Sequence, residues 1–589
     1  MSPLDHLPAR TLPALTRELA GQMPSRRAVL ADDGELTYAE LDHECRSFAR
    51  ALRTIGINAG DAVGVLLPNG IRWFIAVLGA HYAGAIAVPL NTWAKAGELN
   101  HCVDTAEVIL IVADRKIIGN DFESILRSGS LIDAGGRKGR HFLGTRFWPA
   151  GVPLPEGMRD EPADLERVQE TATAYVLFTS GSTALPKGVP LIHRDLLTNG
   201  YEIGKRHRFN SDDKLWIASP FFFSMGSVNA VPSVLTHGAS FCIQERYDVE
   251  PTLDLIERER CSVYYGLPPV TRAILASPTL QDRDLSSLRT GMGAMSRQDK
   301  IEAITQLGIE GMCSVYGSTE AYTLCTITEP DDPLDVKIAT QGRPLPSQEV
   351  RIVADEEVAP CGVVGEIEVR GCTTPGYLGL VGAERERYWR DGWFRTGDLG
   401  SFGDDGRLRF TGRISDTVKT NGILVAPADV EASIIGHPGV REVVVFGLPD
   451  ERRGESLVAV VVPVKWDRQS LDDLLSQLPG YVRSHNASYK VPQFIWFGQA
   501  TGLPLTDTGK LKRRGLVDLA LAEDWRSLYP SGGAVKSLER SDESSADDAD
   551  GNRLWQSNSS RFMTLRSAMS HRTSRARFRL DCWPSSGPR

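Results

Sequence analysis

Short runs rich in valine and isoleucine alternate with longer helical patterns from about Thr37 to Ala500, and this alternation limits the chain to folds built of α/β units. One instance is the run AVGVLLP, followed by IRWFIAVLGAHYAG and then by AIAVPL. Because a helix between two short apolar strands lets both strands run parallel in one sheet, the pattern predicts an α/β fold with parallel strands. Further strands are expected at Val108 to Asp114, Tyr175 to Ser180 and Leu215 to Pro220.

The longest apolar stretch, Trp73 to Leu90, approaches the length of a membrane span. It contains His81, Tyr82, Gly84 and Pro89, which suit a helix, a turn and a strand better than one continuous helix. We therefore expect a buried helix that ends near Gly84, followed by a core strand, and no transmembrane span. The N-terminus has no basic segment followed by an apolar core, so no secretion signal is expected either.

Composition narrows the class of protein. With 589 residues, the chain exceeds the size at which a single hydrophobic core keeps growing, so two or three domains are expected. Hydrophobic residues make up 41% and charged residues 24%, which is ordinary globular usage. A net charge of -9 argues against a general nucleic-acid binder. The nine cysteines form no metal-binding pattern, which favours a reduced compartment, with the cytoplasm as the expected location.

Two segments differ in sequence pattern from the α/β part. From about Gly342, short strands such as GEIEVRG and RLRFTG are separated by Gly, Pro and Asp turns, which predicts a β-rich subdomain. After about Trp525 the chain is first rich in Ser, Asp and Glu and then rich in Arg, without hydrophobic periodicity. An arginine-rich tail could tether a protein to a nucleic acid or a membrane surface, but a disordered appendage is the interpretation we favour.

A loop rich in small and hydroxyl residues carries the first chemical signal. The apolar run YVLF leads into Thr179, Ser180, Gly181, Ser182 and Thr183, and Lys187 follows. Small residues let the backbone approach an anion, hydroxyls donate hydrogen bonds, and lysine adds positive charge, so the loop is suited to phosphate. It is not the P-loop of kinases and ATPases, because Pro186 precedes the lysine and Gly188 follows it. Taken alone, a purely structural loop explains the same composition.

The loop resembles the signature of the adenylate-forming (AMP-binding) superfamily, which includes acyl-CoA synthetases, and further motifs follow in that family's order. The similarity spans about residue 12 to residue 520. The motifs are LTYAELD at 36–42, YGSTE at 316–320, GWFRTGDLG at 392–400, GRISDTVKTNG at 412–422, VFGLPDERRGE at 445–455 and LPLTDTGKLKR at 503–513.

The resemblance implies a reaction and a domain plan. In the family, a carboxylate attacks the α-phosphate of ATP, pyrophosphate leaves, and a thiol then attacks the acyl-AMP. It implies ATP and Mg²⁺ as cofactors and coenzyme A as co-substrate. The domains expected are an AMP-binding domain of parallel α/β units plus a β-rich subdomain at 1–411, a small mobile α+β domain at 412–525, and a disordered tail at 526–589.

Site residues carry over by matching the motifs. The residues expected at ATP or AMP are Thr179, Ser180, Gly181, Ser182, Thr183, Lys187, Gly293, Ala294, Tyr316, Gly317, Ser318, Thr319, Asp398 and Arg413. Glu320, with Thr183, is expected at the metal, and Asp398 with Arg413 at the ribose. The alternative role for Asp398, without the resemblance, is that of a turn residue in a Gly-Asp pair.

Lys510 matches the mobile lysine that neutralises charge as the carboxylate attacks, and Glu320 is the second residue expected to be catalytic. The alternative for Lys510 is a solvated lysine in a basic run. Ser415 matches the hinge of the rotating C-terminal domain, and Lys419 and Gly422 match positions that line the thiol's tunnel. An ordinary hairpin turn is the alternative for the last two.

Three positions depart from the family pattern. Ala184 replaces a Gly or Ser in the phosphate loop, where its Cβ costs about 1 kcal/mol if φ is positive. Phe223 stands where a histidine often faces the carboxylate, so aromatic gating is retained and a hydrogen bond is lost. Ser415 replaces the usual Asp or Lys at the hinge.

The expected acyl pocket suggests the substrate. Its residues are aromatic, apolar or uncharged: Phe223, Ser224, Met225, Tyr264, Tyr265 and Met292. A hydrophobic carboxylic acid, fatty or aromatic, fits such a pocket better than an amino acid. The partners expected are this small acid and CoA, with no nucleic acid, and a homodimer stays open. Alternatives are transfer to a carrier-protein pantetheine, a non-catalytic scaffold, or a phosphotransferase, of which the last lacks a kinase-like motif set.

Overall fold

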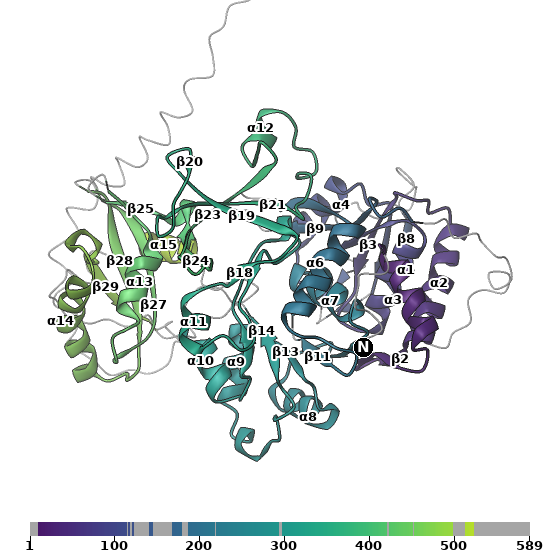
Figure 1. The fold of residues 1–589 in the computed structure, drawn as a ribbon, viewed down its shortest axis with the longest axis horizontal. Helices are drawn as coiled ribbons and strands as arrows, with labels where there is room; N and C mark the ends of the chain where they lie inside the picture. Colours follow the sequence, from purple (N-terminus) through teal and green to yellow (C-terminus); the bar gives the residue numbers. More distant parts are fainter. Residues whose placement is uncertain are drawn as a thin grey trace, which may run out of the picture. The chain divides into compact units, whose positions relative to one another are not determined.

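The computed structural model describes residues 10–114, 116–117, 120–122, 141–144, 168–179, 186–217, 219–293, 297–420, 423–450, 453–498 and 513–522. Strands and helices alternate in its first half, as Figure 1 shows. The predicted mixed α/β fold with parallel sheets is confirmed. The tail at 526–589 lies outside the described residues.

The first sheet carries the phosphate loop. Its strands are parallel except for β10, which runs antiparallel to β9. In spatial order they are β10 (Lys187–Ile192), β9 (Thr173–Thr179), β4 (Ile86–Pro89), β3 (Ala62–Leu66), β5 (Leu110–Ala113) and β8 (His141–Gly144).

The apolar stretch beginning at Trp73 folds as expected. It forms helix α3 (Ile71–Tyr82), a turn with Gly84 at φ +73°, and strand β4. Nearly all side chains of α3 are buried, because the helix packs between α2 (Tyr38–Thr54) and the sheet. Among the described residues, no helix is both long and apolar enough to cross a membrane.

The second sheet is parallel except at one edge, where β1 and β2 form a hairpin. Its strands are, in spatial order, β15 (Gly311–Cys313), β14 (Thr290–Met292), β13 (Val263–Tyr265), β11 (Lys214–Ile217), β12 (Ser240–Ile243), β1 (Arg27–Ala31) and β2 (Gly34–Thr37). Because the carboxyl ends of parallel strands meet at one edge, the residues after β14 and β15 are brought together there.

Helices cover both sheets. The N-terminus of α2 shows how the sequence starts one of them: Thr37 and Glu40 form a reciprocal capping box. The other helices of this part are α1 (Leu12–Gln22), α4 (Ala96–Thr105), α6 (His193–Arg206), α7 (Val231–Leu235), α8 (Val249–Glu259), α9 (Pro268–Leu275), α10 (Arg297–Thr305) and α11 (Leu334–Ala339).

The β-rich subdomain predicted from Gly342 is present as an antiparallel sheet. Its strands are β20 (Glu357–Val358), β19 (Gln348–Ala354), β21 (Gly365–Gly371), β23 (Trp393–Phe402) and β22 (Trp389–Arg390), with β24 (Leu408–Arg413) paired to β23. A short sheet of β16 (Val315–Tyr316), β17 (Thr326–Ile327) and β18 (Arg343–Pro344) precedes it. Helix α12 (Ala383–Glu386) lies between β21 and β22 in the chain.

The C-terminal part has its own sheet and its own hydrophobic core. The strands are β26 (Ile423–Val425), β25 (Val418–Thr420), β28 (Gly454–Pro463) and β27 (Val440–Asp450), with β29 (Phe494–Phe497) beside β28. Its helices are α13 (Pro427–Ile434), α14 (Arg468–His485) and α15 (Arg513–Ala522). A smaller α+β C-terminal domain is therefore present, and the boundary at 411/412 stays a prediction.

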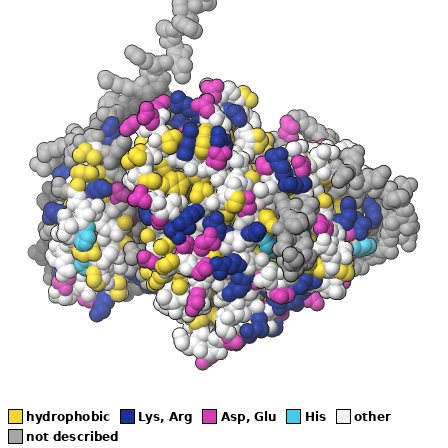
Figure 2. Space-filling model, viewed as in Figure 1, with side chains coloured by type: hydrophobic (Ala, Val, Ile, Leu, Met, Phe, Trp, Pro, Cys, Tyr) yellow, Lys and Arg dark blue, Asp and Glu magenta, His cyan; other side chains and the backbone are white. Residues whose placement is uncertain are grey.

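Basic and acidic side chains are intermixed on the described part of the face in Figure 2. Among the described residues many charged side chains form ion pairs, as Arg351 does with Glu368 and Arg395 with Glu366. Such partly exposed pairs contribute little stability each, about 0 to 1 kcal/mol.

Candidate active site

The phosphate loop connects the two strands of a β-hairpin. Thr179 ends β9, Lys187 begins β10, and the two residues are directly paired. Residues 180–185 between them, which include Ser180 to Thr183 and Ala184, lie outside the described residues, and their roles stay predictions. The hairpin explains why the loop is short and why its lysine is fixed at one end, because the antiparallel register holds both ends of the loop together.

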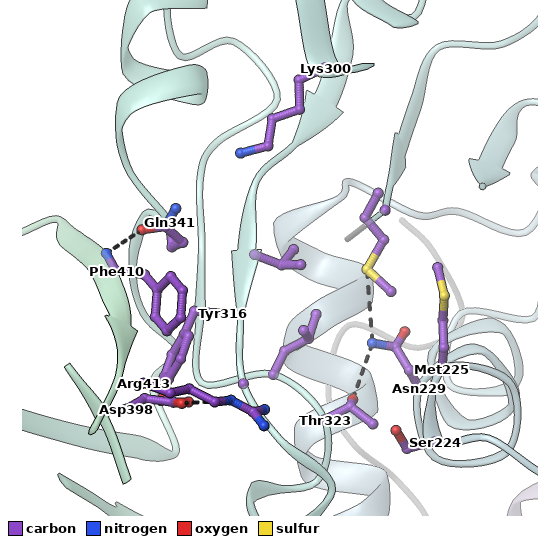
Figure 3. Close-up of a pocket in the computed structure, with 15 residues that line it drawn as sticks. Ser224, Met225, Asn229, Lys300, Tyr316, Thr323, Gln341, Asp398, Phe410 and Arg413 are labelled. Carbon is purple, nitrogen blue, oxygen red and sulfur yellow. Dashed lines mark hydrogen bonds and ion pairs between the residues drawn. The ribbon is translucent and has the colours of Figure 1, made fainter. Parts of the chain in front are cut away.

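A cavity of about 340 Å³ brings together residues from motifs far apart in the chain. Figure 3 shows it between Tyr316 and Asp398 on one side and Met225 on the other. The predicted site residues that line it are Ser224, Met225, Met292, Gly293, Tyr316, Gly317, Asp398 and Arg413. Seven further residues complete the lining: Asn229, Lys300, Val315, Thr323, Leu324, Gln341 and Phe410.

Asp398 supplies the carboxylate among the described residues that line this cavity. It lies on β23 opposite Arg413 of β24, and Arg413 Nε is 3.2 Å from Asp398 Oδ1. The Tyr316 hydroxyl donates to Asp398 Oδ2 at 2.9 Å. The residue is 8% exposed. A carboxylate fixed in this way is well placed to accept hydrogen bonds from two neighbouring hydroxyls, as a ribose offers.

Tyr316 presents its ring to the cavity. Burial, with the Asp398 carboxylate beside it, raises the pKa of the Tyr316 hydroxyl, which therefore stays a donor. Its ring stacks on Phe410 with centroids 5.7 Å apart. The Phe410 backbone N–H donates to Gln341 Oε1 at 2.7 Å. These contacts hold a flat aromatic wall of the kind on which a base stacks.

The turn after Tyr316 is tight and locally strained. A Cβ on Gly317 would lie 2.0 Å from the Thr323 carbonyl oxygen, so only glycine fits there. Tyr322 and Thr323 have φ of +56° and +82°, which is costly for residues with a Cβ. Within the described residues, the buried Ser318 hydroxyl has no hydrogen-bond partner. A strained turn with an unsatisfied donor is typical of a ligand site.

Glu320 lies in the same turn and is 8% exposed. Its Oε1 accepts a hydrogen bond from the Tyr377 hydroxyl at 2.6 Å. Within the described residues, no cluster of three or more His, Cys, Asp or Glu could hold a metal. One carboxylate oxygen nevertheless fits Mg²⁺, which usually binds one or two protein carboxylates and completes its shell with phosphates and water. Thr319 begins this turn, and Thr183 lies outside the described residues.

The other side of the cavity comes from a π-helix, Met225–Ala230. Met225 and Asn229 both line the cavity, and a wide helical turn of this kind often marks a functional site. Asn229 Nδ2 donates to Thr323 Oγ1 at 3.2 Å, while its buried Oδ1 has no partner among the described residues. Phe223, just before it, contacts the rings of Phe222 and Trp93. Its place in the acyl pocket stays a prediction.

Tyr264 and Tyr265 are fully buried in the sheet rather than exposed to the cavity. Tyr264 stacks on Trp216 and shares a hydrogen bond with Thr271, and Tyr265 belongs to the main core. Alternation along β13 explains this, because successive side chains point to opposite faces of a sheet that is covered on both sides.

The lining residues that no motif singled out include Asn229, Lys300, Gln341 and Phe410. Lys300 is the one with the clearest electrostatic consequence. It lies on α10, is 9% exposed, and its ammonium points toward the Gln341 side of the cavity in Figure 3. Burial lowers the pKa of Lys300 to about 8.

We expect Lys300→Met to stabilise the nucleotide-free protein near pH 7. The unfolded chain keeps the Lys300 proton up to about pH 10.5, whereas the folded state releases it near pH 8, so wild-type stability rises with pH across that window. The cost below pH 8 is about 3 kcal/mol. The free energy of unfolding in urea should be higher for the variant than for wild type at pH 7, and this difference should be smaller at pH 10. A difference independent of pH would contradict this, and Lys95→Met, at an exposed lysine, is the control.

Residues assigned to the second half-reaction lie in the C-terminal part. Ser415 is exposed in a short 3-10 turn, and its hydroxyl donates to Asp416 Oδ1 at 3.1 Å. Lys419 lies on β25, where its backbone N–H donates to Glu455 Oε2 at 2.6 Å. Gly422 and Lys510, like Ala294, lie outside the described residues. The roles of all these residues stay predictions.

Comparisons with known proteins show the family of the chain. Residues 16–378 match the AMP-binding enzyme family, and residues 429–510 match the AMP-binding enzyme C-terminal domain. The chain belongs to the AMP-binding enzyme family, which confirms the resemblance drawn from the motifs.

Two curated relatives align over most of both chains. A 3-[(3aS,4S,7aS)-7a-methyl-1,5-dioxo-octahydro-1H-inden-4-yl]propanoyl:CoA ligase of Mycobacterium tuberculosis is 32% identical, over 87% of this chain and 99% of its own length. A feruloyl-CoA synthase of Amycolatopsis is also 32% identical, over 84% of this chain and 95% of its own length. Among solved structures, a fatty acyl CoA synthetase of Mycobacterium tuberculosis superposes with a TM-score of 0.68 at 25% identity, covering 87% of this chain and 99% of that one.

Proposed function

We propose that this chain, an AMP-forming acyl-CoA ligase, activates a hydrophobic carboxylic acid as its acyl-AMP and then transfers the acyl group to CoA. The class of enzyme is the one that the sequence predicted, and the family match with its curated relatives confirms it. ATP, Mg²⁺ and CoA are the cofactors and co-substrates of this class. The proposal adds to this class a hydrophobic acid as substrate and roles for individual residues.

One observation carries the proposal, namely the division of the cavity into two unlike sides. The Tyr316 side holds the charged residues Asp398, Arg413 and Lys300. The opposite side is uncharged, with Ser224, Met225 and Asn229. Met292 lies beside Asn229, whose Nδ2 is 3.9 Å from the Met292 sulfur. A nucleotide needs charged and polar partners, whereas an uncharged wall with two methionines favours an acyl group without a charge of its own.

The relatives support this choice without narrowing it. The names of the two curated ligases describe a feruloyl group and a propanoyl group on a substituted ring system, and both are mostly hydrocarbon. We infer the same broad class for this chain. Fatty and aromatic acids both remain within it.

The residue roles follow from charge. Asp398 and Arg413 would hold the ribose, Tyr316 the base, and Lys187 with the hydroxyls of the loop the phosphates. Glu320 would hold Mg²⁺, which supplies positive charge to the phosphate oxygens when bound. Lys510 would approach the α-phosphate and neutralise charge as the carboxylate oxygen attacks phosphorus and pyrophosphate leaves. The thiolate then attacks the acyl carbon, and AMP leaves with the carboxylate oxygen.

A panel of acids tests the substrate class. Medium-chain and long-chain fatty acids, cinnamic acids and amino acids would be compared for pyrophosphate release and CoA thioester. We expect release with some hydrophobic acids, at a rate at least about tenfold above that with amino acids. A preference for amino acids would contradict the proposed substrate. Pyrophosphate release without a CoA thioester would instead favour a carrier-protein pantetheine as acceptor.

We also propose that the enzyme acts in the cytoplasm on small molecules without a nucleic-acid partner. A homodimer is compatible with this, and light scattering of the purified chain would measure its mass.

A further inference from the structure

Lys187 is held between two tyrosines that no motif singled out. Its ammonium donates to the Tyr388 hydroxyl at 2.6 Å and lies 4.2 Å from the centre of that ring. It also lies 4.8 Å from the centre of the Tyr377 ring, and the two rings meet edge to face at 5.2 Å. Both the hydrogen bond and the ring faces attract a cation, so the flexible lysine side chain has one preferred position.

Tyr377 connects this lysine to the candidate metal carboxylate. Its ring faces the Lys187 ammonium, and its hydroxyl donates to Glu320 Oε1 at 2.6 Å. The cation expected at the phosphates and the carboxylate expected at Mg²⁺ therefore share one aromatic side chain.

Backbone contacts around Tyr377 join the phosphate-loop hairpin to the turn that carries Glu320. The Thr374 N–H donates to the Glu320 carbonyl, and the Thr374 hydroxyl donates to the Pro190 carbonyl, both at 2.7 Å. The Leu378 N–H donates to the Gly188 carbonyl at 2.8 Å. The segment from Thr374 to Leu378 thus joins the phosphate-loop hairpin to the turn that carries Glu320.

We propose that Tyr388 and Tyr377 are positioning residues for adenylation, which hold the Lys187 ammonium and the Glu320 carboxylate at a fixed separation suited to a magnesium-bound polyphosphate. This inference rests on the proposed function and adds two residues to it. An ammonium has three N–H donors, and the bond to Tyr388 uses one, so with respect to the described residues the others are available to phosphate oxygens. Fixing a long lysine side chain beforehand lowers the entropy lost when the nucleotide binds.

The proposal predicts a selective effect of the Tyr388 hydroxyl. Tyr388→Phe keeps the ring and loses the hydrogen bond, and we expect it to raise the KM for ATP about tenfold in acyl-AMP formation. The KM for the acid and the rate of thioester formation from supplied acyl-AMP should stay within about twofold, since neither involves the β- and γ-phosphates. Tyr247→Phe is the matched control, because it also removes one tyrosine hydrogen bond, to the Val270 carbonyl, in a different core cluster.

A double-mutant cycle with Lys187→Met separates positioning from a general structural role. If Tyr388 acts through Lys187, Tyr388→Phe should change the KM for ATP by less than about twofold in the Lys187→Met background. A further tenfold rise in the KM for ATP on adding Tyr388→Phe to Lys187→Met would overturn the proposal. Thermal unfolding of each variant shows whether the fold is intact. If a variant fails to fold, the cycle is run with Lys187→Arg, which keeps the charge and should retain most of the effect of Tyr388→Phe.

Magnesium dependence tests the second tyrosine. Tyr377→Phe removes the hydrogen bond to Glu320, so it should shift the half-saturating Mg²⁺ concentration by about threefold or more, whereas Tyr388→Phe should not. Equal shifts in both variants, or none in Tyr377→Phe, would contradict the assigned link. Wild-type protein without acid-dependent pyrophosphate release would refute the proposed function itself, while additive effects in an active enzyme would refute only this inference.

Discussion

Lys510→Ala should lose acyl-AMP formation by a factor of about 10² to 10³, because the variant lacks the ammonium that stabilises charge on the attacked phosphate. Thioester formation from supplied acyl-AMP should stay within about threefold of wild type, since this lysine is expected to be absent from that step. Pyrophosphate release measures the first half-reaction, and chromatography of the CoA thioester measures the second.

The chain around this lysine is anchored on its C-terminal side. Three residues on, Arg513 donates to both carboxylate oxygens of Glu431 at 2.7 and 2.9 Å and to Asp416 at 3.0 Å. It also donates to the Val445 carbonyl at 3.2 Å. These contacts fix the start of α15 against α13 and β27, three residues after Lys510 in the sequence.

Lys512→Ala is the matched control, because it removes a nearby positive charge from the same basic run and should leave both half-reactions within about threefold. Equal loss of both half-reactions in Lys510→Ala, with the fold intact, would remove the role assigned to this residue.

Asp398→Ala should raise the KM for ATP by about 10² to 10³. Two charge-assisted hydrogen bonds to the ribose are lost, worth about 1.5 to 3 kcal/mol each before partial compensation by water. The substitution also leaves the buried Tyr316 hydroxyl without the partner it has at 2.9 Å, which should lower the stability of the fold by about 1 to 3 kcal/mol.

Tyr316→Phe separates these two effects, because it removes the same hydrogen bond and leaves the carboxylate in place. It should raise the KM for ATP only a few fold. If Asp398 were only a turn residue, the two variants would have similar KM values for ATP, and Asp398→Ala would affect stability alone. Initial rates of acid-dependent pyrophosphate release at varied ATP give the KM, and thermal unfolding gives the stability.

Local patterns predicted the elements well. The Gly84 and Pro89 break divided one long apolar stretch into α3 and β4, because glycine allows the positive φ of the turn and proline ends the strand. The return strand β10 was less visible. Its sequence KGVPLI contains both Gly and Pro, which weaken a strand signal, yet it pairs antiparallel with β9 over its whole length.

The motifs predicted which distant residues would meet. Tyr316, Asp398 and Arg413 come from three motifs and are joined by a hydrogen bond from Tyr316 to Asp398 and an ion pair between Asp398 and Arg413. Motif matching could not find Lys300, Asn229, Tyr377 or Tyr388. A buried lysine or an aromatic residue in a loop has no motif that marks it in the sequence. Its role depends on contacts with residues far away in the chain. Tyr264 and Tyr265 are buried in a sheet covered on both faces, and the predicted acyl pocket as a whole stays a prediction.

The fate of the carboxylate oxygen tests the central claim most directly. A hydrophobic acid found active in the panel, labelled with ¹⁸O in its carboxylate, would be converted with ATP, Mg²⁺ and CoA, and the products would be weighed by mass spectrometry. Attack on the α-phosphate predicts one ¹⁸O in AMP and none in pyrophosphate. Label in inorganic phosphate, together with ADP, would mean attack on the γ-phosphate and would contradict adenylation by this chain.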